Sequence, residues 1–169
     1  MSGGSITPAG WLTKTVFDYI EYKIPTCSSG EVEYEIISLG DCTLKPCRGC
    51  QLCFWQGEEF CPLKDDRDML FEKIRVSDGV VFATPNYCGD VSGILKMFID
   101  RFGFACHRPH YFGKVFTSIV TQAIGAGGRI VEYLDVHGTS LAFTVVKDVS
   151  QIETPEQRTA HERDIMRVV

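Results

Sequence analysis

Half of the cysteines in this chain lie close together in one short segment. Four of the eight form the pattern Cys-x2-Cys-x2-Cys-x7-Cys, at Cys47, Cys50, Cys53 and Cys61. Thiolates at such short spacing can wrap around a compact iron–sulfur cubane. Zinc sites more often use two separated Cys-x2-Cys pairs, which this sequence lacks. The segment therefore predicts an iron–sulfur cluster, with a zinc site and free or oxidised thiols as the alternatives.

The other cysteines are scattered along the chain. In a reducing compartment, a tight cysteine cluster indicates metal binding or catalysis before it indicates disulfides. Cys88 lies in a loop that is itself a candidate ligand site, although a small buried apolar role is the commoner one for cysteine. We expect Cys27, Cys42 and Cys106 to be structural and to lie outside the volume that the four clustered cysteines enclose.

Three loops have the composition of ligand sites. Residues 3–10 combine glycines and hydroxyls ahead of a helix, which suits a phosphate, although a flexible N-terminal stretch is an equal alternative. Residues 84–93 follow a buried strand and could frame a flat heteroaromatic ligand, or simply connect to a helix capped by Ser92. Residues 121–128 are rich in glycine, which permits close approach to a ligand and equally permits motion.

Composition and charge exclude several functional classes. The chain has 17 basic and 22 acidic residues and a net charge of -5, which argues against a nucleic-acid or anionic-membrane binder. It has neither a membrane-spanning apolar run nor the features of a signal peptide, so we expect a single cytoplasmic domain. No hydrolase or metalloprotease constellation is present. A small basic patch is formed by His107, Arg108 and His110. It is either part of a solvated loop or a surface that attracts an anionic donor or substrate.

Strand and helix patterns alternate along the chain. The patterns predict strands at 31–37, 79–84, 115–120 and 141–146. Helices are expected after the first loop, at 66–76, at 92–102, from the glycines at 125–128 to about Val136, and from Pro155 onward. The continuous apolar run at 79–84 suits a strand buried on both faces. This order predicts a parallel sheet covered by helices, with ligands at the carboxyl ends of its strands.

Three sequence stretches together resemble a known family. They are Cys47-Arg48-Gly49-Cys50-Gln51-Leu52-Cys53 with Cys61 and Lys64-Asp65-Asp66, then residues 77–87, and then Val91 to Arg101. The combination resembles the iron–sulfur flavoproteins, within the flavodoxin-like NAD(P)H-dependent FMN reductases. The resemblance covers residues 4 to about 146.

The resemblance implies a fold and a set of site residues. The fold would be an α/β flavodoxin-like three-layer sandwich, one FMN-binding domain over residues 1–169 with a cysteine-cluster loop at 42–64. The FMN phosphate would lie on Ser5, Thr7, Gly10 and Thr13, and the isoalloxazine against Thr84, Pro85, Asn86, Tyr87, Thr121, Gly125 and Gly127. Cys47, Cys50, Cys53 and Cys61 would ligate a [4Fe-4S] cluster. No side chain would be needed as a nucleophile, and Asp100 and Arg101 would be structural.

Two departures from the family pattern stand at the start of the chain. The family's first loop usually reads Gly-Ser-Pro-Arg followed by Gly-Asn-Thr, whereas Ile6, Thr7, Trp11 and Leu12 occupy several of those positions here. The family also begins with a buried strand, and only Met1-Ser2-Gly3 precedes Gly4. We therefore expect either that residues upstream are missing or that the sheet is rearranged, because an unpaired central ladder is too costly.

The implied activity is electron transfer. The chain would pass electrons between the cluster, FMN and an external partner, with a ferredoxin or NAD(P)H as donor, and would form a homo-oligomer. One alternative is an NAD(P)H-dependent flavin, quinone or nitroaromatic reductase without a cluster. Another is a non-enzymatic redox sensor or electron carrier that uses the cysteines as a switch.

Overall fold

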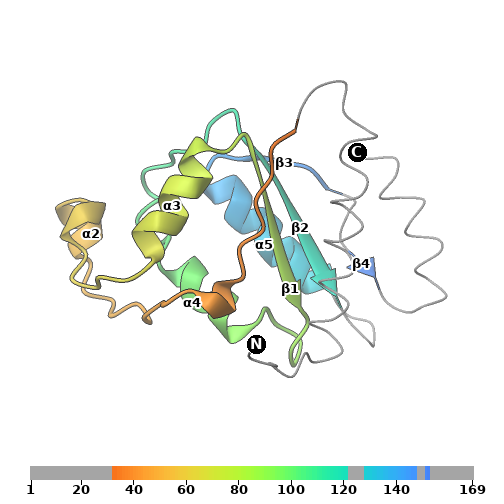
Figure 1. Cartoon of the computed structure of the whole chain (residues 1–169), viewed down its shortest axis with the longest axis horizontal. Helices are drawn as coiled ribbons and strands as arrows, with labels where there is room; N and C mark the ends of the chain where they lie inside the picture. Colours follow the sequence, from red (N-terminus) through yellow and green to blue (C-terminus); the bar gives the residue numbers. More distant parts are fainter. Residues whose placement is uncertain (1–31, 122–127, 148–150, 153–169) are drawn as a thin grey trace.

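The computed structural model describes residues 32–121 and 128–147 and the backbone of residues 151–152. The predicted helices after the first loop and after Pro155 lie outside these residues. Within them the chain forms a parallel sheet with helices packed against it (Figure 1).

Two long strands form the centre of the described sheet. β1 (Gly79–Pro85) pairs in parallel with β2 (Val115–Thr121) over its whole length, from Gly79 opposite Val115 to Pro85 opposite Thr121. This pairing confirms both predicted strands and their parallel direction. It also brings the carboxyl ends of the two strands to the same edge, where ligands of such sheets bind.

The other edge of β2 carries two short strands. β3 (Thr144–Val145) pairs with the start of β2, and β4 (Gln151–Ile152) pairs with its end. The strand predicted at 141–146 is therefore shorter at its start than expected. The reason is that α5 (Gly128–Ser140) runs further than Val136 and closes in a turn, in which Ala142 has a φ of 71° and the N–H of Phe143 donates to the carbonyl of Gly138.

The predicted strand at 31–37 is wrong for the residues that the structure describes there. Residues 32–38 belong to no strand and lead into the short helix η1 (Leu39–Asp41). Val32, Tyr34 and Ile36 are all exposed by more than 40%. The alternation of apolar and acidic residues sets which way side chains face, but a strand also needs a partner ladder, and the described residues provide none here.

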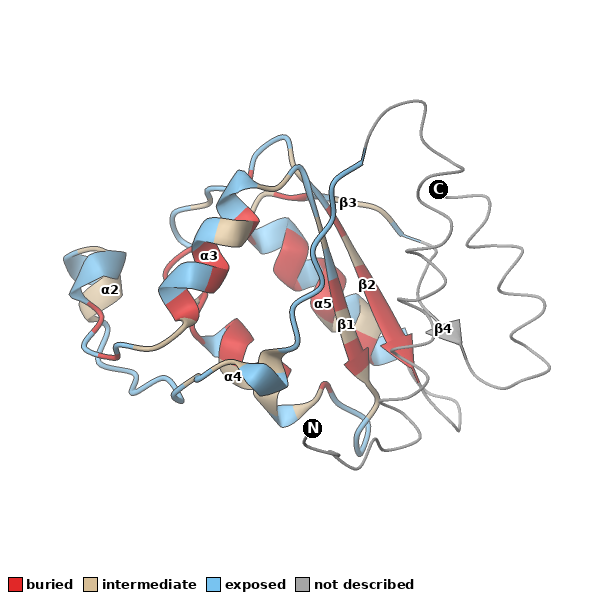
Figure 2. Ribbon diagram, viewed as in Figure 1, coloured by how far each residue is buried: buried red, intermediate tan, exposed pale blue. Residues whose placement is uncertain are grey.

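Three helices cover one face of the sheet. α3 (Arg67–Val76), α4 (Gly93–Asp100) and α5 share one apolar core with Phe82 of β1 and Phe116 of β2. Figure 2 shows the buried residues gathered on these strands and helices. On the opposite face of β1, Val81 is 43% exposed, so the prediction of a strand buried on both faces is wrong for this position. The described residues thus form a parallel sheet with one helical layer packed on it, as the predicted α/β flavodoxin-like sandwich requires of this part of the chain.

The helices are short, and the cysteine segment lies to one side of them. No helix among the described residues has the length and apolar character needed to cross a bilayer. The segment from Cys42 to Lys64 contains the one-turn helix α2 (Leu52–Trp55) and the short helix η2 (Glu58–Phe60), and α3 follows it directly (Figure 1).

Candidate functional site

Backbone hydrogen bonds close the base of the cysteine loop. The N–H of Thr43 donates to the Asp66 carboxylate at 2.6 Å, and the N–H of Asp66 donates to the carbonyl of Thr43 at 3.0 Å. One step inward, the N–H of Lys45 donates to the Asp65 carboxylate at 2.8 Å. The two ends of the loop are therefore held together, and all four clustered cysteines lie between them.

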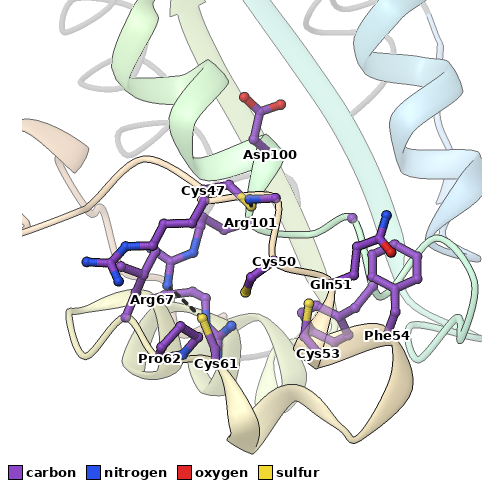
Figure 3. Close-up of a pocket in the computed structure, with 15 residues that line it drawn as sticks. Cys47, Cys50, Gln51, Cys53, Phe54, Cys61, Pro62, Arg67, Asp100 and Arg101 are labelled. Atoms are coloured by element: carbon purple, nitrogen blue, oxygen red, sulfur yellow. Dashed lines mark hydrogen bonds between the residues drawn. The ribbon is translucent and has the colours of Figure 1, made fainter.

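The four clustered cysteines border one cavity (Figure 3). Its volume is about 70 Å³, several times the roughly 10–15 Å³ that one water molecule needs. The wall combines the cysteines with two guanidinium groups and apolar rings, and it includes Cys47, Cys50, Cys53, Cys61, Phe54, Arg67, Arg101 and Phe104. Among the described cysteines, Cys42, Cys88 and Cys106 do not line it, as expected for the first and last of these.

The loop turns sharply between the first three cysteines. Gly49 and Gln51 both have left-handed backbone conformations, with φ of 63° and 60°. The Gly49 N–H donates to the Cys47 sulfur at 3.5 Å, and α2 begins immediately after Gln51. These turns bring Cys47, Cys50 and Cys53 around the same space, although only Gly49 is of the residue type that adopts such a φ without strain.

The cysteines differ in exposure but are all free thiols. Cys61 is buried, Cys53 is half-buried, and Cys47 and Cys50 are exposed. Burial raises the pKa of the Cys53 thiol, and the neighbouring Cys61 adds to the rise. Among the described residues, no three cysteine, histidine or acidic side chains are set closely enough to hold a metal ion. The sulfurs thus share a cavity without standing at ligand positions.

Two buried cations face these sulfurs. The Arg101 guanidinium donates to the Cys61 sulfur at 3.6 Å and forms a buried ion pair with Asp65 at 2.7 Å. Arg67, 2% exposed, donates to the carbonyl of Glu58 at 2.9 Å and lies over the Phe71 ring. Burial opposes ionisation of Asp65, but hydrogen bonds from Arg101 and the Lys45 and Arg67 backbone outweigh it and lower its pKa. Arg67 also forms an ion pair with Asp68, so each guanidinium at the cavity is already paired with a carboxylate.

The carboxyl ends of β1 and β2 form a second candidate site. The Asn86 N–H donates to the carbonyl of Thr121 at 2.8 Å, so the loop from Thr84 to Tyr87 meets Thr121. The Thr84 hydroxyl is buried; it accepts from the N–H of Ser92 at 3.0 Å and donates to the Pro85 carbonyl at 3.1 Å. The Tyr87 ring is 44% exposed at this edge.

The loop beyond this edge is itself hydrogen-bonded. The Asn86 side-chain oxygen accepts from the N–H of Gly89, and the Ser92 hydroxyl accepts from the N–H of Leu95 at 3.4 Å. The predicted cap at Ser92 is thereby confirmed. The remaining predicted flavin contacts and one predicted structural cysteine lie outside the described residues; they are Ser5, Thr7, Gly10, Thr13, Gly125, Gly127 and Cys27.

Comparison with known proteins identifies the family. Residues 4–155 match the family described as NADPH-dependent FMN reductase. The chain belongs to this family. It is 34% identical to an iron-sulfur flavoprotein of Methanocaldococcus jannaschii over 68% of this chain and 58% of that protein. It is 39% identical to an iron-sulfur flavoprotein of Archaeoglobus fulgidus over 57% of this chain and 47% of that protein.

Solved structures support the fold in the same way. The crystal structure of RosB with a bound riboflavin-5'-phosphate derivative superposes with a TM-score of 0.68 at 15% identity, over 92% of this chain and 62% of that one. At that identity the likeness concerns the fold alone. The chain spans about half the length of the curated relatives that it matches.

Sequence reasoning missed part of the cavity that the cysteines line. The sequence pattern gives no indication of Arg67, and the family resemblance implies only a structural role for Arg101. Part of the basic patch also has a defined position: Arg108 donates to the Phe54 carbonyl at 3.3 Å and the His107 ring lies 5.0 Å from the Phe54 ring. These two residues brace the cysteine loop. For Arg67 and Arg101, the sequence offers only an arginine beside an aspartate at a helix end, and this pattern has no distinctive spacing.

Proposed function

We propose that this chain is an FMN-dependent electron-transfer oxidoreductase of the iron–sulfur flavoprotein type. In this proposal Cys47, Cys50, Cys53 and Cys61 hold a [4Fe-4S] cluster, and electrons pass between it, FMN and an external donor or acceptor. The observation that carries the proposal is the shared cavity: four free thiols and two buried guanidinium groups line one space inside a closed loop.

The residues of the cavity fit the cluster chemically. Four thiolates are the usual ligand set of a [4Fe-4S] cluster, and the ligated cluster is anionic. Arg67 and Arg101 are buried beside the sulfurs, and although each is paired with an aspartate, their N–H groups and charge reduce the cost of placing an anion there. Cys47 and Cys50 are exposed and lie on a loop, so their side chains can turn toward Cys53 and Cys61 without disturbing the core.

The two candidate sites lie at opposite ends of one helix. α4 begins at Gly93, just after the loop at the carboxyl end of β1, and ends at Asp100, which lines the cysteine cavity. At 1.5 Å per residue, an eight-residue helix is about 12 Å long. When bound, the cluster supplies one-electron transfer and FMN exchanges one or two electrons. The chain's own contribution is to hold both groups on one rigid element.

The flavin site in this proposal is the strand edge described above. Thr84, Pro85, Asn86, Tyr87 and Thr121 would frame the isoalloxazine, with Ser5, Thr7, Gly10 and Thr13 on the phosphate and Gly125 and Gly127 near the ring. A ferredoxin or NAD(P)H would be the donor, and the working unit would be a homo-oligomer in a reducing compartment such as the cytoplasm.

Anaerobic purification with iron analysis and visible spectroscopy tests the proposal. We expect flavin absorption bands and about four irons per chain. Cys50→Ser should abolish iron binding and leave the flavin bound, because the flavin edge is a separate segment. Cys106→Ser is the matched control, since this cysteine does not line the cavity, and it should retain iron. Iron retained in full by Cys50→Ser would contradict the proposal.

A second candidate is an NAD(P)H-dependent FMN reductase without a cluster. It is favoured by the finding that, in the part of the chain that the structure describes, no three potential ligands stand at metal-binding positions. Flavin without iron after anaerobic purification would support this candidate. A protein with neither flavin nor iron would leave the cysteines as a redox switch.

A further inference from the structure

The Arg101 side chain makes more contacts than closing a helix requires. The side chain is 1% exposed, and its guanidinium donates to the carbonyl of Lys45 at 2.7 Å and to the two oxygens of Asp65 at 2.7 and 3.2 Å. The nitrogen Nη2 that reaches Asp65 at 3.2 Å also donates to the Cys61 sulfur at 3.6 Å. One buried group therefore connects the end of α4, the base of the cysteine loop and a cysteine sulfur.

Hydrogen bonds to a ligand sulfur change the reduction potential of an iron–sulfur cluster. A donor to the sulfur of a cluster ligand stabilises the reduced, more negative form and raises the reduction potential. The planar fork of an arginine can make all of these bonds at once, whereas a lysine ammonium keeps the charge but not the geometry. Asp65 opposes the effect, because it carries a negative charge in contact with the same guanidinium.

We propose that Arg101 is a positioning residue that orients Cys61 and raises the reduction potential of the cluster, with Asp65 limiting that rise. This inference rests on the proposed function above. The proposed role differs from that of a purely structural ion pair in its effect on the reduction potential. Removing the sulfur donor and removing the acidic partner should shift the potential in opposite directions.

The test is a redox titration of anaerobically reconstituted protein, followed by electron paramagnetic resonance. Arg101→Lys should lower the equilibrium constant for one-electron reduction by about tenfold, which is about 59 mV toward more negative potential. Asp65→Asn should shift the midpoint toward more positive potential. Arg108→Lys is the matched control: Arg108 is exposed and also tethers the cysteine loop, through the Phe54 carbonyl, but among the described residues it donates no hydrogen bond to a sulfur. Its midpoint should stay at the wild-type value.

Each outcome has a separate meaning. Wild-type protein that binds no iron overturns the proposed function and this inference with it. Wild-type protein that binds iron, with unshifted midpoints in both cavity variants, overturns the role of Arg101 alone. Variants that fold by circular dichroism but bind no iron also overturn it, because Arg101 would then serve only to build the loop. If Arg101→Lys does not fold, the sign of the shift in Asp65→Asn decides.

Discussion

A buried histidine in α5 should make the stability of this protein depend on mild acid. His137 is 9% exposed, and among the described residues its Nε2 atom has no hydrogen-bond partner. Its ring meets the Phe102 ring edge-on, with centroids 5.7 Å apart. Burial, assisted by the charge of Lys96, lowers its pKa from 6.5 to about 4. The imidazole is therefore neutral in the folded protein at pH 7 and accepts a proton only with difficulty.

The sign follows from proton binding. Between pH 6.5 and 4 the unfolded chain binds a proton at this histidine and the folded chain does not, so the free energy of unfolding falls as the pH falls. An ordinary pKa of 6.5 and a folded pKa of about 4 correspond to about 3 kcal/mol in full. About 2 kcal/mol of this should be lost by pH 5. Above pH 6.5 the contribution is constant.

Urea unfolding at a series of pH values, in wild type and His137→Gln, measures this contribution. The glutamine side chain does not titrate, so the difference in unfolding free energy between the two proteins should change by about 2 kcal/mol between pH 7 and pH 5. His110→Gln is the control, because His110 is exposed, and it should keep the wild-type pH profile. A difference between wild type and His137→Gln that stays constant over this range would refute the reasoning.

Two further predictions concern packing and capping. Gly138→Ala should destabilise the protein by roughly 1–3 kcal/mol in thermal or urea unfolding, because the added Cβ would lie 2.6 Å from the Phe116 ring. Gly93→Ala is the control and should be neutral or slightly stabilising, because nothing lies within 4 Å of its added Cβ. Equal effects of the two substitutions would contradict the argument. Ser92→Ala should cost about 1 kcal/mol by loss of the cap on α4, and Ser92→Thr should recover most of it.

The sequence allowed prediction of those parts of the fold that depend on local pattern. The sequence patterns that predict strands at 79–84 and 115–120 and a helix over 66–76 are visible in short windows, and the structure forms β1, β2 and α3 there. The failure at residues 31–37 has a different physical origin. A strand exists only when another strand completes its ladder, and alternation alone does not show whether one is available.

The candidate site divides in the same way, between local spacing and distant pairing. The spacing from Cys47 to Cys61 is local, and these cysteines line one cavity. Their convergence on one cluster stays a prediction, because among the described residues no three potential ligands are set closely enough to hold a metal ion. One of the two arginines that line this cavity is held by a pairing across a long stretch of chain. Arg101 meets Asp65 from 36 residues away, and neither residue type is unusual near a helix end. Removing one partner of a buried ion pair strongly destabilises a protein. The two residues are therefore better understood as one unit that connects α4 to the cysteine loop. Because α4 begins beside the proposed flavin site and ends at this unit, a change at Arg101 that tilts the helix should alter both candidate cofactor sites.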